Sequence, residues 1–228
     1  FGIFSPITRL HSSRSPFNSK EPWFFSDTTS KIMKKYLRLR HQMIPYLYTM
    51  NVQTHEEGAP LISPMYYFYP ESDESYNVPN QYFFGTELMV APIVEKMDLA
   101  FQSAKVDVWF PEGEWYDFFS EKKYTGGVKL SVYRDISTIP VFAKSGAIIP
   151  LVGSEIDMGV ELPEVVDWYV FPGKQHSFEM IEDQNGQRYK TRLSIDWEMG
   201  MVELTLQGDS SIVPSNRRHR IHFKGTNV

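Results

Sequence analysis

The spacing of hydrophobic residues changes near Gly58. Before this glycine, apolar side chains recur every three or four residues, which predicts one face of a long helix. Asp27 can cap the start of that helix, Pro45 should kink or divide it, and Gly58 should end it. The apolar positions of this helix are Ile32, Met33, Tyr36, Leu37, Leu39, Met43, Ile44, Leu47 and Tyr48.

A short apolar run, residues 5–10, precedes the helix. It is separated from the helix by a loop rich in Ser and Pro, over residues 12–23. Clusters of these residues between periodic segments mark loops. We therefore predict strand, polar loop and helix over residues 1–57, which together make one βα unit.

After Gly58 the chain consists of short β-type runs with turn residues between them. Evenly spaced short strands of this kind indicate β-sandwiches. A second β unit begins near Ile149 and Pro150, and Asn185-Gly186 is a strong hairpin signal. The sequence thus predicts a mainly β fold with two sandwich domains, residues 58–149 and 150–228. The predicted strands lie within residues 88–94, 104–110, 115–119, 128–132, 139–142, 167–171, 177–181, 192–197 and 201–206.

Composition narrows the function classes. The 228 residues contain no cysteine, which excludes disulfides and thiolate zinc sites. No Asn-X-Ser/Thr acceptor is present either, and both absences suit a cytoplasmic bacterial protein. No apolar run is long enough to span a bilayer, and we expect no cofactor.

Charge and aromatic content add two further points. The net charge is −5 with scattered basic residues, which argues against a nucleic-acid partner. Only residues 217–220 are locally basic, and we interpret them as a solvated turn or strand end. Aromatic residues reach 15%, a level that suits either sugar-binding platforms or sandwich cores. For the five tryptophans, packing is the preferred interpretation.

Several segments resemble glycoside hydrolase family 31, the α-glucosidase/α-xylosidase family, and they occur in the order of that family. This resemblance implies that residues 1–57 are the remnant of the end of a (β/α)8 barrel, namely its last strand and helix. It also implies a proximal and a distal C-terminal β-sandwich. The segments are FSPITRLHSS (4–13), RLRHQMIPYLY (38–48), PLISPM (60–65), FGTELMVAPI (84–93), WFPEGEWYD (109–117), PVFAKSGAIIP (140–150) and EDQNG (182–186) with Tyr189.

The resemblance implies a retaining α-glycosidase whose two catalytic aspartates lie upstream, so no catalytic residue is assigned in this chain. Such a mechanism needs two carboxylates roughly 5 Å apart. The carboxylates that the turn patterns contain are interpreted as structural, since turns favour acidic side chains for backbone reasons. They are Glu112, Glu114, Asp117, Glu182 and Asp183.

Two residues are candidates for contact with substrate. By resemblance, the imidazole of His11 should hydrogen-bond a hydroxyl of the sugar at the cleavage subsite. On a strand, Arg9 would share a face with His11. Arg9 would then either orient the sugar or form an ion pair at the barrel end, and the sequence leaves both readings open.

The function expected from the resemblance is hydrolysis of a terminal, non-reducing α-linked glucose from an α-glucoside oligosaccharide. This chain alone should be inactive, because it would supply part of the sugar subsite and the sandwiches only. The alternatives are a fragment of an α-xylosidase, or a stand-alone carbohydrate-binding or structural β-sandwich module without catalysis. An incomplete barrel also needs cover for its open edge, and a homo-oligomer is one way to provide it.

Overall fold

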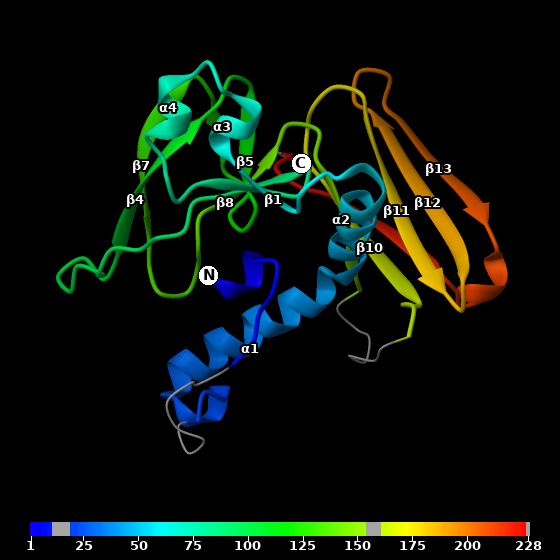
Figure 1. The fold of residues 1–228 in the computed structure, drawn as a ribbon, viewed down its shortest axis with the longest axis horizontal. Coiled ribbons are helices and arrows are strands. Elements are labelled where there is room, and N and C mark those ends of the chain that lie inside the picture. The colour runs from blue at the N-terminus through cyan, green and yellow to red at the C-terminus, as the bar shows by residue number, and fades with distance from the viewer. Residues whose placement is uncertain (11–18, 154–160, 227–228) are drawn as a thin grey trace.

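The chain is described by a computed structural model over residues 1–10, 19–153 and 161–226. Helices form the N-terminal part and β-sheets the rest, so the predicted mainly β fold is confirmed. Two β regions lie on either side of α2 (Ile44–Glu57), and α1 (Asp27–Gln42) runs beneath them (Figure 1). The division into domains at residues 58 and 150 remains a prediction.

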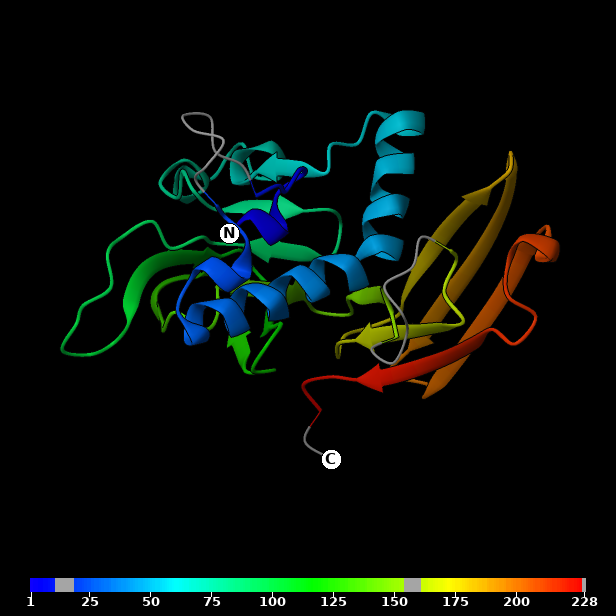
Figure 2. The ribbon, with the colours of Figure 1, turned by 90° about the horizontal axis from the view of Figure 1, so that it is seen from below.

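Pro45 divides the predicted long helix into two. It lies in the first turn of α2, where its missing N–H costs no hydrogen bond. Gly58 ends α2 in the left-handed conformation at φ 72°, as predicted. The N-cap of α1 is Ser26 rather than Asp27, because the Ser26 hydroxyl accepts from the Thr29 N–H at 3.3 Å. A second view shows α1 and α2 meeting at an angle (Figure 2).

The predicted strand over residues 5–10 is wrong for this chain. A 3-10 helix, η1 (Gly2–Phe4), comes first, and residues 5–10 carry no strand. The physical reason is that none of the described strands pairs with this segment, so its carbonyl groups find another donor. The guanidinium of Arg40 donates to the carbonyl oxygens of Ile3, Ser5 and Pro6 at 2.6, 2.7 and 2.8 Å.

The proximal region is a sandwich of two sheets. Six strands in the order β1-β2-β3-β8-β5-β6 form one sheet, and the antiparallel pair β4 and β7 forms the other. Two short helices, α3 (Met65–Phe68) and α4 (Asp73–Tyr76), follow β1. The strands are β1 (Ile62–Pro64), β2 (Tyr82–Phe84), β3 (Leu88–Val90), β4 (Ala104–Phe110), β5 (Glu114–Asp117), β6 (Lys123–Thr125), β7 (Val128–Arg134) and β8 (Val141–Lys144).

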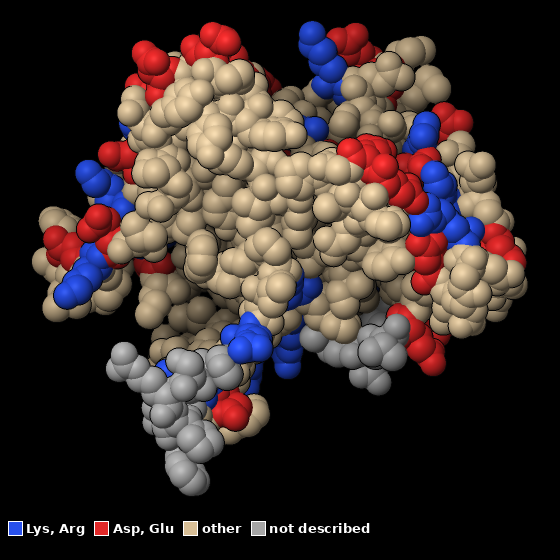
Figure 3. All heavy atoms as spheres, viewed as in Figure 1, with Lys and Arg blue, Asp and Glu red and all other residues tan. Residues whose placement is uncertain are grey.

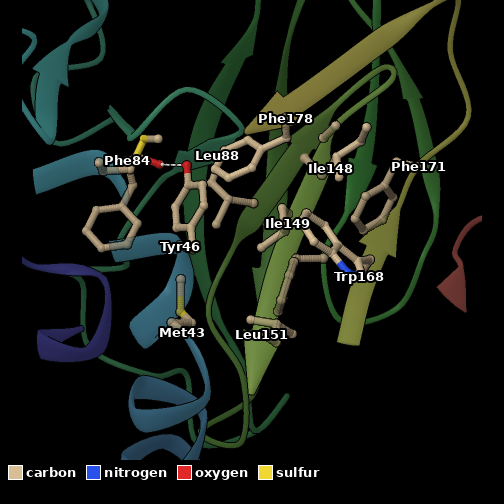
Figure 4. Packing of buried hydrophobic residues seen from close by; sticks show 14 of the residues in the cluster. Met43, Tyr46, Phe84, Leu88, Ile148, Ile149, Leu151, Trp168, Phe171 and Phe178 are labelled. Carbon is tan, nitrogen blue, oxygen red and sulfur yellow. Dashed lines mark hydrogen bonds between the residues drawn. The ribbon is translucent and has the colours of Figure 1, made fainter. Parts of the chain in front are cut away.

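The central strands of the six-stranded sheet are buried on both faces. Leu88 and Val90 face the main core, which also contains Tyr46 from α2 (Figure 4). Met89 and Phe142 face the smaller core between this sheet and the β4–β7 pair. A strand that is covered on both sides reads as a continuous apolar run, which explains the sequence of β3.

The distal region also contains two sheets. Strands β9 and β14 flank β10, with β14 parallel to β10, while β11, β12 and β13 form an antiparallel meander. The Asn185-Gly186 turn joins β11 to β12 with both residues at positive φ, so the predicted hairpin is confirmed. The elements are β9 (Ile148–Val152), β10 (Val165–Val170), β11 (His176–Gln184), β12 (Gln187–Asp196), β13 (Met201–Gly208), η3 (Ser210–Ile212), a 3-10 helix, and β14 (Arg218–Phe223).

The basic residues 217–220 lie at a strand end, which was one of the two interpretations, because β14 begins at Arg218. The guanidinium groups of Arg217 and Arg220 form bidentate pairs with acidic side chains of the distal region. Arg217 pairs with Glu182 at 2.9 and 3.1 Å, and Arg220 pairs with Asp167 at 2.6 and 2.9 Å. Arg217 and Arg220 therefore stabilise the distal fold.

We predict that Arg40→Met lowers the free energy of unfolding by about 2 kcal/mol, because three carbonyl groups lose a charged donor. Hydrogen exchange should accelerate most in the first ten residues. Urea unfolding and exchange mass spectrometry measure the two effects. Arg38→Met is the matched control, since Arg38 is an exposed arginine of the same helix. Equal stabilities of the two variants would contradict the role given to Arg40.

Candidate functional site

Of the two residues predicted to contact substrate, the structure describes Arg9 but not His11. His11 lies outside the described residues. Arg9 is described and is exposed, and the described residues offer it no ion-pair partner. Because residues 5–10 form no strand, the alternation of side chains along a strand no longer places Arg9 and His11 on one face. Their roles remain predictions.

Arg9 borders a shallow, mostly apolar hollow of about 330 Å³. Side chains from α1, from the segment around η1 and from the chain between β7 and β8 line it, among them Ile32, Tyr36 and Ile139. Leu10, which lines it, is 45% exposed, and Ile7 of the same segment is 82% exposed. Exposed apolar groups gathered in this way mark a surface that another part of a protein normally covers.

Glu87 forms the most highly connected polar site of the described chain. Its carboxylate is 2% exposed and lies in the turn between β2 and β3. The Thr86 hydroxyl donates to Oε1 at 2.8 Å, and the Ile148 N–H donates to Oε2 at 3.1 Å. Lys144 Nζ lies 3.2 Å from Oε1 and His176 Nε2 lies 3.2 Å from Oε2. One carboxylate thus joins β3, β8, β9 and β11.

The backbone of Glu87 is held as well. Its N–H donates to the hydroxyl oxygen of Tyr46 at 3.1 Å, and that hydroxyl donates to the Phe84 carbonyl at 2.7 Å (Figure 4). Gly85 lies between them at φ 66°, and a Cβ there would collide with the Tyr46 hydroxyl and with Met50. The motif therefore requires glycine at this position for both conformation and space.

The pKa of Glu87 lies below its ordinary value. Burial alone would raise this pKa, but the nearby His176 imidazole and the positive charge of Lys144 outweigh it and favour the ionised carboxylate. Glu87 lies in the segment FGTELMVAPI (84–93), but its role was not predicted from the sequence. The available signal was an acidic residue set directly before a buried apolar strand, where a charge needs partners.

The other buried carboxylates of the described residues are also paired with cations. Asp117 pairs with Arg134, and the Asp117 side chain accepts the N–H groups of Phe119 and Ser120 at 3.0 and 2.8 Å. Asp167 and Glu182 form the pairs with arginine described above. The structural interpretation of Asp117 and Glu182 is therefore supported, and none of these groups is free to act as a nucleophile or an acid.

The tryptophans mostly pack, as expected. Trp109, Trp115 and Trp168 are buried, while Trp197 is partly buried and packs edge-on against Phe223. Trp23 is the exception, with 70% of its surface exposed in the 3-10 helix η2 (Pro22–Phe24). Among the described residues no group of three or more His, Cys, Asp or Glu could hold a metal ion. None of the described helices is long and apolar enough to cross a membrane.

Comparison with known protein families decides where these features belong. Residues 1–50 match the TIM-barrel domain of glycosyl hydrolases family 31, and residues 58–149 match the C-terminal domain of the same family. The chain belongs to glycoside hydrolase family 31. Within this family, the chain combines the end of the barrel domain with the proximal sandwich that holds Glu87, and the distal sandwich follows.

Relatives with curated names act on α-linked sugars. An α-xylosidase of Saccharolobus solfataricus is 32% identical over 219 residues, which cover 90% of this chain and 28% of the relative. Alpha-glucosidase 2 of Bacillus thermoamyloliquefaciens is 27% identical over 224 residues, which cover 94% of this chain and 27% of the relative. The chain therefore spans little more than a quarter of the length of these family 31 proteins.

Solved structures of family 31 enzymes agree with this fold. A dextranase of Flavobacterium johnsoniae, in complex with isomaltotriose, superposes with a TM-score of 0.76 at 30% identity, over 90% of this chain and 27% of the dextranase. An α-xylosidase of Xanthomonas citri reaches a TM-score of 0.84 over 98% of this chain and 25% of its own. Its identity is 23%, so this second likeness concerns the fold alone.

We predict that Glu87→Gln lowers the free energy of unfolding by about 3 kcal/mol at pH 7, because it removes a buried charge that is paired with the ammonium group of Lys144. The folded-state pKa of Glu87 is lowered, so its stabilisation is present above the unfolded pKa and is lost as pH falls through the folded value. The difference between wild type and variant should therefore shrink in acid. Urea unfolding at several pH values measures it.

The matched control for this prediction is Glu114→Gln. Glu114 pairs with Lys123, but its side chain is 44% exposed, so its loss should cost less than about 1 kcal/mol. If both variants lost the same stability, Glu87 would be an ordinary surface ion pair and its role as the junction of the sheets would be refuted.

A second pH dependence comes from His219. Burial, followed by the charge of Arg217, lowers the pKa of His219 from 6.5 to about 4, and its Nδ1 accepts the Trp168 indole N–H at 3.0 Å. Between these pH values the unfolded chain binds a proton that the folded chain does not, so stability should fall as pH drops from 6.5 to 4. His219→Gln keeps an acceptor for Trp168 and should flatten this slope in urea titrations. Parallel pH profiles for wild type and variant would exclude His219 as the cause.

Proposed function

We propose that this chain is the C-terminal part of a retaining α-glycosidase that removes terminal, non-reducing α-linked glucose from oligosaccharides. The observation that carries the proposal is the succession of a barrel-domain match and a C-terminal-domain match along one chain. Relatives named α-glucosidase and α-xylosidase, together with the dextranase that holds isomaltotriose, support the substrate class.

In this proposal the chain contributes to substrate binding rather than to bond cleavage. A retaining mechanism needs a nucleophile and an acid/base about 5 Å apart. The buried carboxylates of the described residues all have cationic partners, which favours a structural role for them. We therefore place both catalytic aspartates on barrel strands that precede this sequence in a longer protein.

His11 and Arg9 are the residues that we assign to the sugar subsite. A neutral histidine can donate a hydrogen bond from one ring nitrogen while the other holds its orientation. Arg40 ties the segment just before Arg9 to α1. In the longer enzyme, barrel strands adjacent to residues 5–10 would supply the pairing that the segment lacks here.

Hydrolysis of an α-xyloside is the second candidate activity. A relative named α-xylosidase is 32% identical to this chain, which supports α-xyloside hydrolysis as an alternative to the release of glucose. A stand-alone binding module fits less well, since such a module has no use for residues 1–50 of a barrel domain. The cytoplasmic, bacterial setting remains a prediction from composition, and relatives named neutral α-glucosidase occur in mouse and human.

We predict that this purified chain has no turnover on aryl α-glucosides or aryl α-xylosides, because the catalytic pair is supplied by other residues. Release of the chromophore, measured against a buffer blank, tests this. Turnover that persists through a second purification would refute the proposed division of labour.

In a longer protein that also contains the preceding barrel strands, His11→Ala should lower kcat/KM by up to several hundred-fold, or about 3 kcal/mol of transition-state binding, through loss of a substrate hydrogen bond. The ratio of α-glucoside to α-xyloside activity in the unsubstituted enzyme would decide between the two substrates. His41→Ala, a histidine on α1, is the matched control. Wild-type kinetics in the His11 variant would remove it from the site.

A further inference from the structure

The proximal sandwich carries exposed aromatic rings that the proposed active site does not use. Helices α3 and α4 present four of them to solvent, at Tyr66, Tyr67, Phe68 and Tyr76. Tyr66 and Tyr76 stack in parallel, with ring centroids 5.3 Å apart and an interplanar angle of 6°. Both helices lie at the outer end of the proximal region, apart from α1 and the N-terminus (Figure 1).

Phe68 belongs to this aromatic surface and also lines a hollow of about 550 Å³. Phe68 is 56% exposed as a residue, and its ring meets Phe83 edge-on with ring centroids 5.3 Å apart. Phe83 in turn lies 6.3 Å from Trp115, whose indole N–H donates to the Pro111 carbonyl at 2.8 Å. The rings that line the hollow are therefore fixed by neighbouring rings and by a hydrogen bond, and its volume is typical of small-molecule sites.

Polar groups line the rest of the hollow. The turn between β2 and β3, the turn between β4 and β5 and the end of β8 bring Thr86, Glu112 and Lys144 to its wall. Lys144 is held by Glu87, so its ammonium group has a defined position. Glu112 is exposed, and the described residues give its carboxylate no ion-pair partner. The hollow thus combines aromatic rings with a charged acceptor, a charged donor and a hydroxyl.

This combination of side chains favours a polyhydroxylated small molecule, rather than a partner protein, as the occupant of the hollow. A protein docked on the hollow would remove Glu112 and Lys144 from water, at a cost that only matched partners offset. A sugar has hydroxyl groups that donate to a carboxylate and accept from an ammonium group, and its C–H faces pack on aromatic rings. One face of the molecule shows a broad area without charged side chains (Figure 3).

We propose that this hollow is an auxiliary carbohydrate site that binds an α-linked glucose oligosaccharide through Phe68 and Glu112. The residues that line this hollow are different from those that line the hollow beside Arg9. The choice of α-linked glucose as the ligand rests on the proposed function. The geometry of the aromatic rings and of the carboxylate is independent of that function. The hollow would hold a long substrate near the enzyme while another part of the substrate is cleaved.

Isothermal titration of this chain with isomaltotriose and maltotriose tests the site, with cellotriose as the β-linked comparison. We expect saturable binding of at least one α-linked trisaccharide and tighter binding than for cellotriose. Phe68→Ala should weaken this binding about tenfold, which corresponds to about 1.4 kcal/mol. Glu112→Met should weaken it several-fold and provides an independent variant at an exposed position.

Phe101→Ala is the matched control, because this phenylalanine is 80% exposed and lies outside the hollow. Thermal unfolding of each variant verifies that it is folded. No binding of either α-linked sugar, or binding that survives both the Phe68 and Glu112 changes in folded protein, would overturn the proposal. Because the assay needs no turnover, its failure is distinguishable from a failure of the proposed catalytic function.

Discussion

The buried carboxylate of Glu87 is the constraint on which the arrangement of this chain depends. A charge in that position is tolerated only while cations and hydrogen-bond donors surround it. Those groups come from β8, β9 and β11, and the backbone of the same residue is held by Tyr46 of α2. The barrel helix, the proximal sheet and the distal meander must therefore be positioned together, or the charge is left without partners.

The same junction explains why the three regions share one core. The ring of Tyr46 stacks on Phe178 of β11 at 5.8 Å, and the Thr49 hydroxyl accepts the Ile181 N–H at 3.0 Å. The helix that the family places in a barrel is thus packed against both β regions. Its position does not depend on the segment before it, because these contacts lie on the C-terminal side of Pro45.

Sequence reasoning succeeded where local chemistry determines the outcome. Pro45, Gly58 and the Asn185-Gly186 turn act through their own backbone preferences, so the helix division, the helix end and the hairpin could be predicted. The absence of a strand at residues 5–10 could not be predicted. A strand exists only with a neighbour to pair with, and pairing is a property of the whole fold. The role of Glu87 was missed for a related reason, since its partners are distant in sequence.

The auxiliary hollow and the proposed sugar subsite also differ in whether local or distant parts of the protein position their residues. Phe68, Phe83 and Trp115 are positioned by the proximal sandwich, whose strands all lie within this sequence, so the auxiliary hollow is complete here. Arg9 belongs to a segment that donates and accepts no ladder hydrogen bonds and is instead tied to Arg40 through neighbouring carbonyl groups. Its geometry toward a sugar therefore depends on barrel strands that would pair with this segment. Carbohydrate binding at the hollow should be an intrinsic property of the chain, whereas the subsite takes its working form only within a closed barrel.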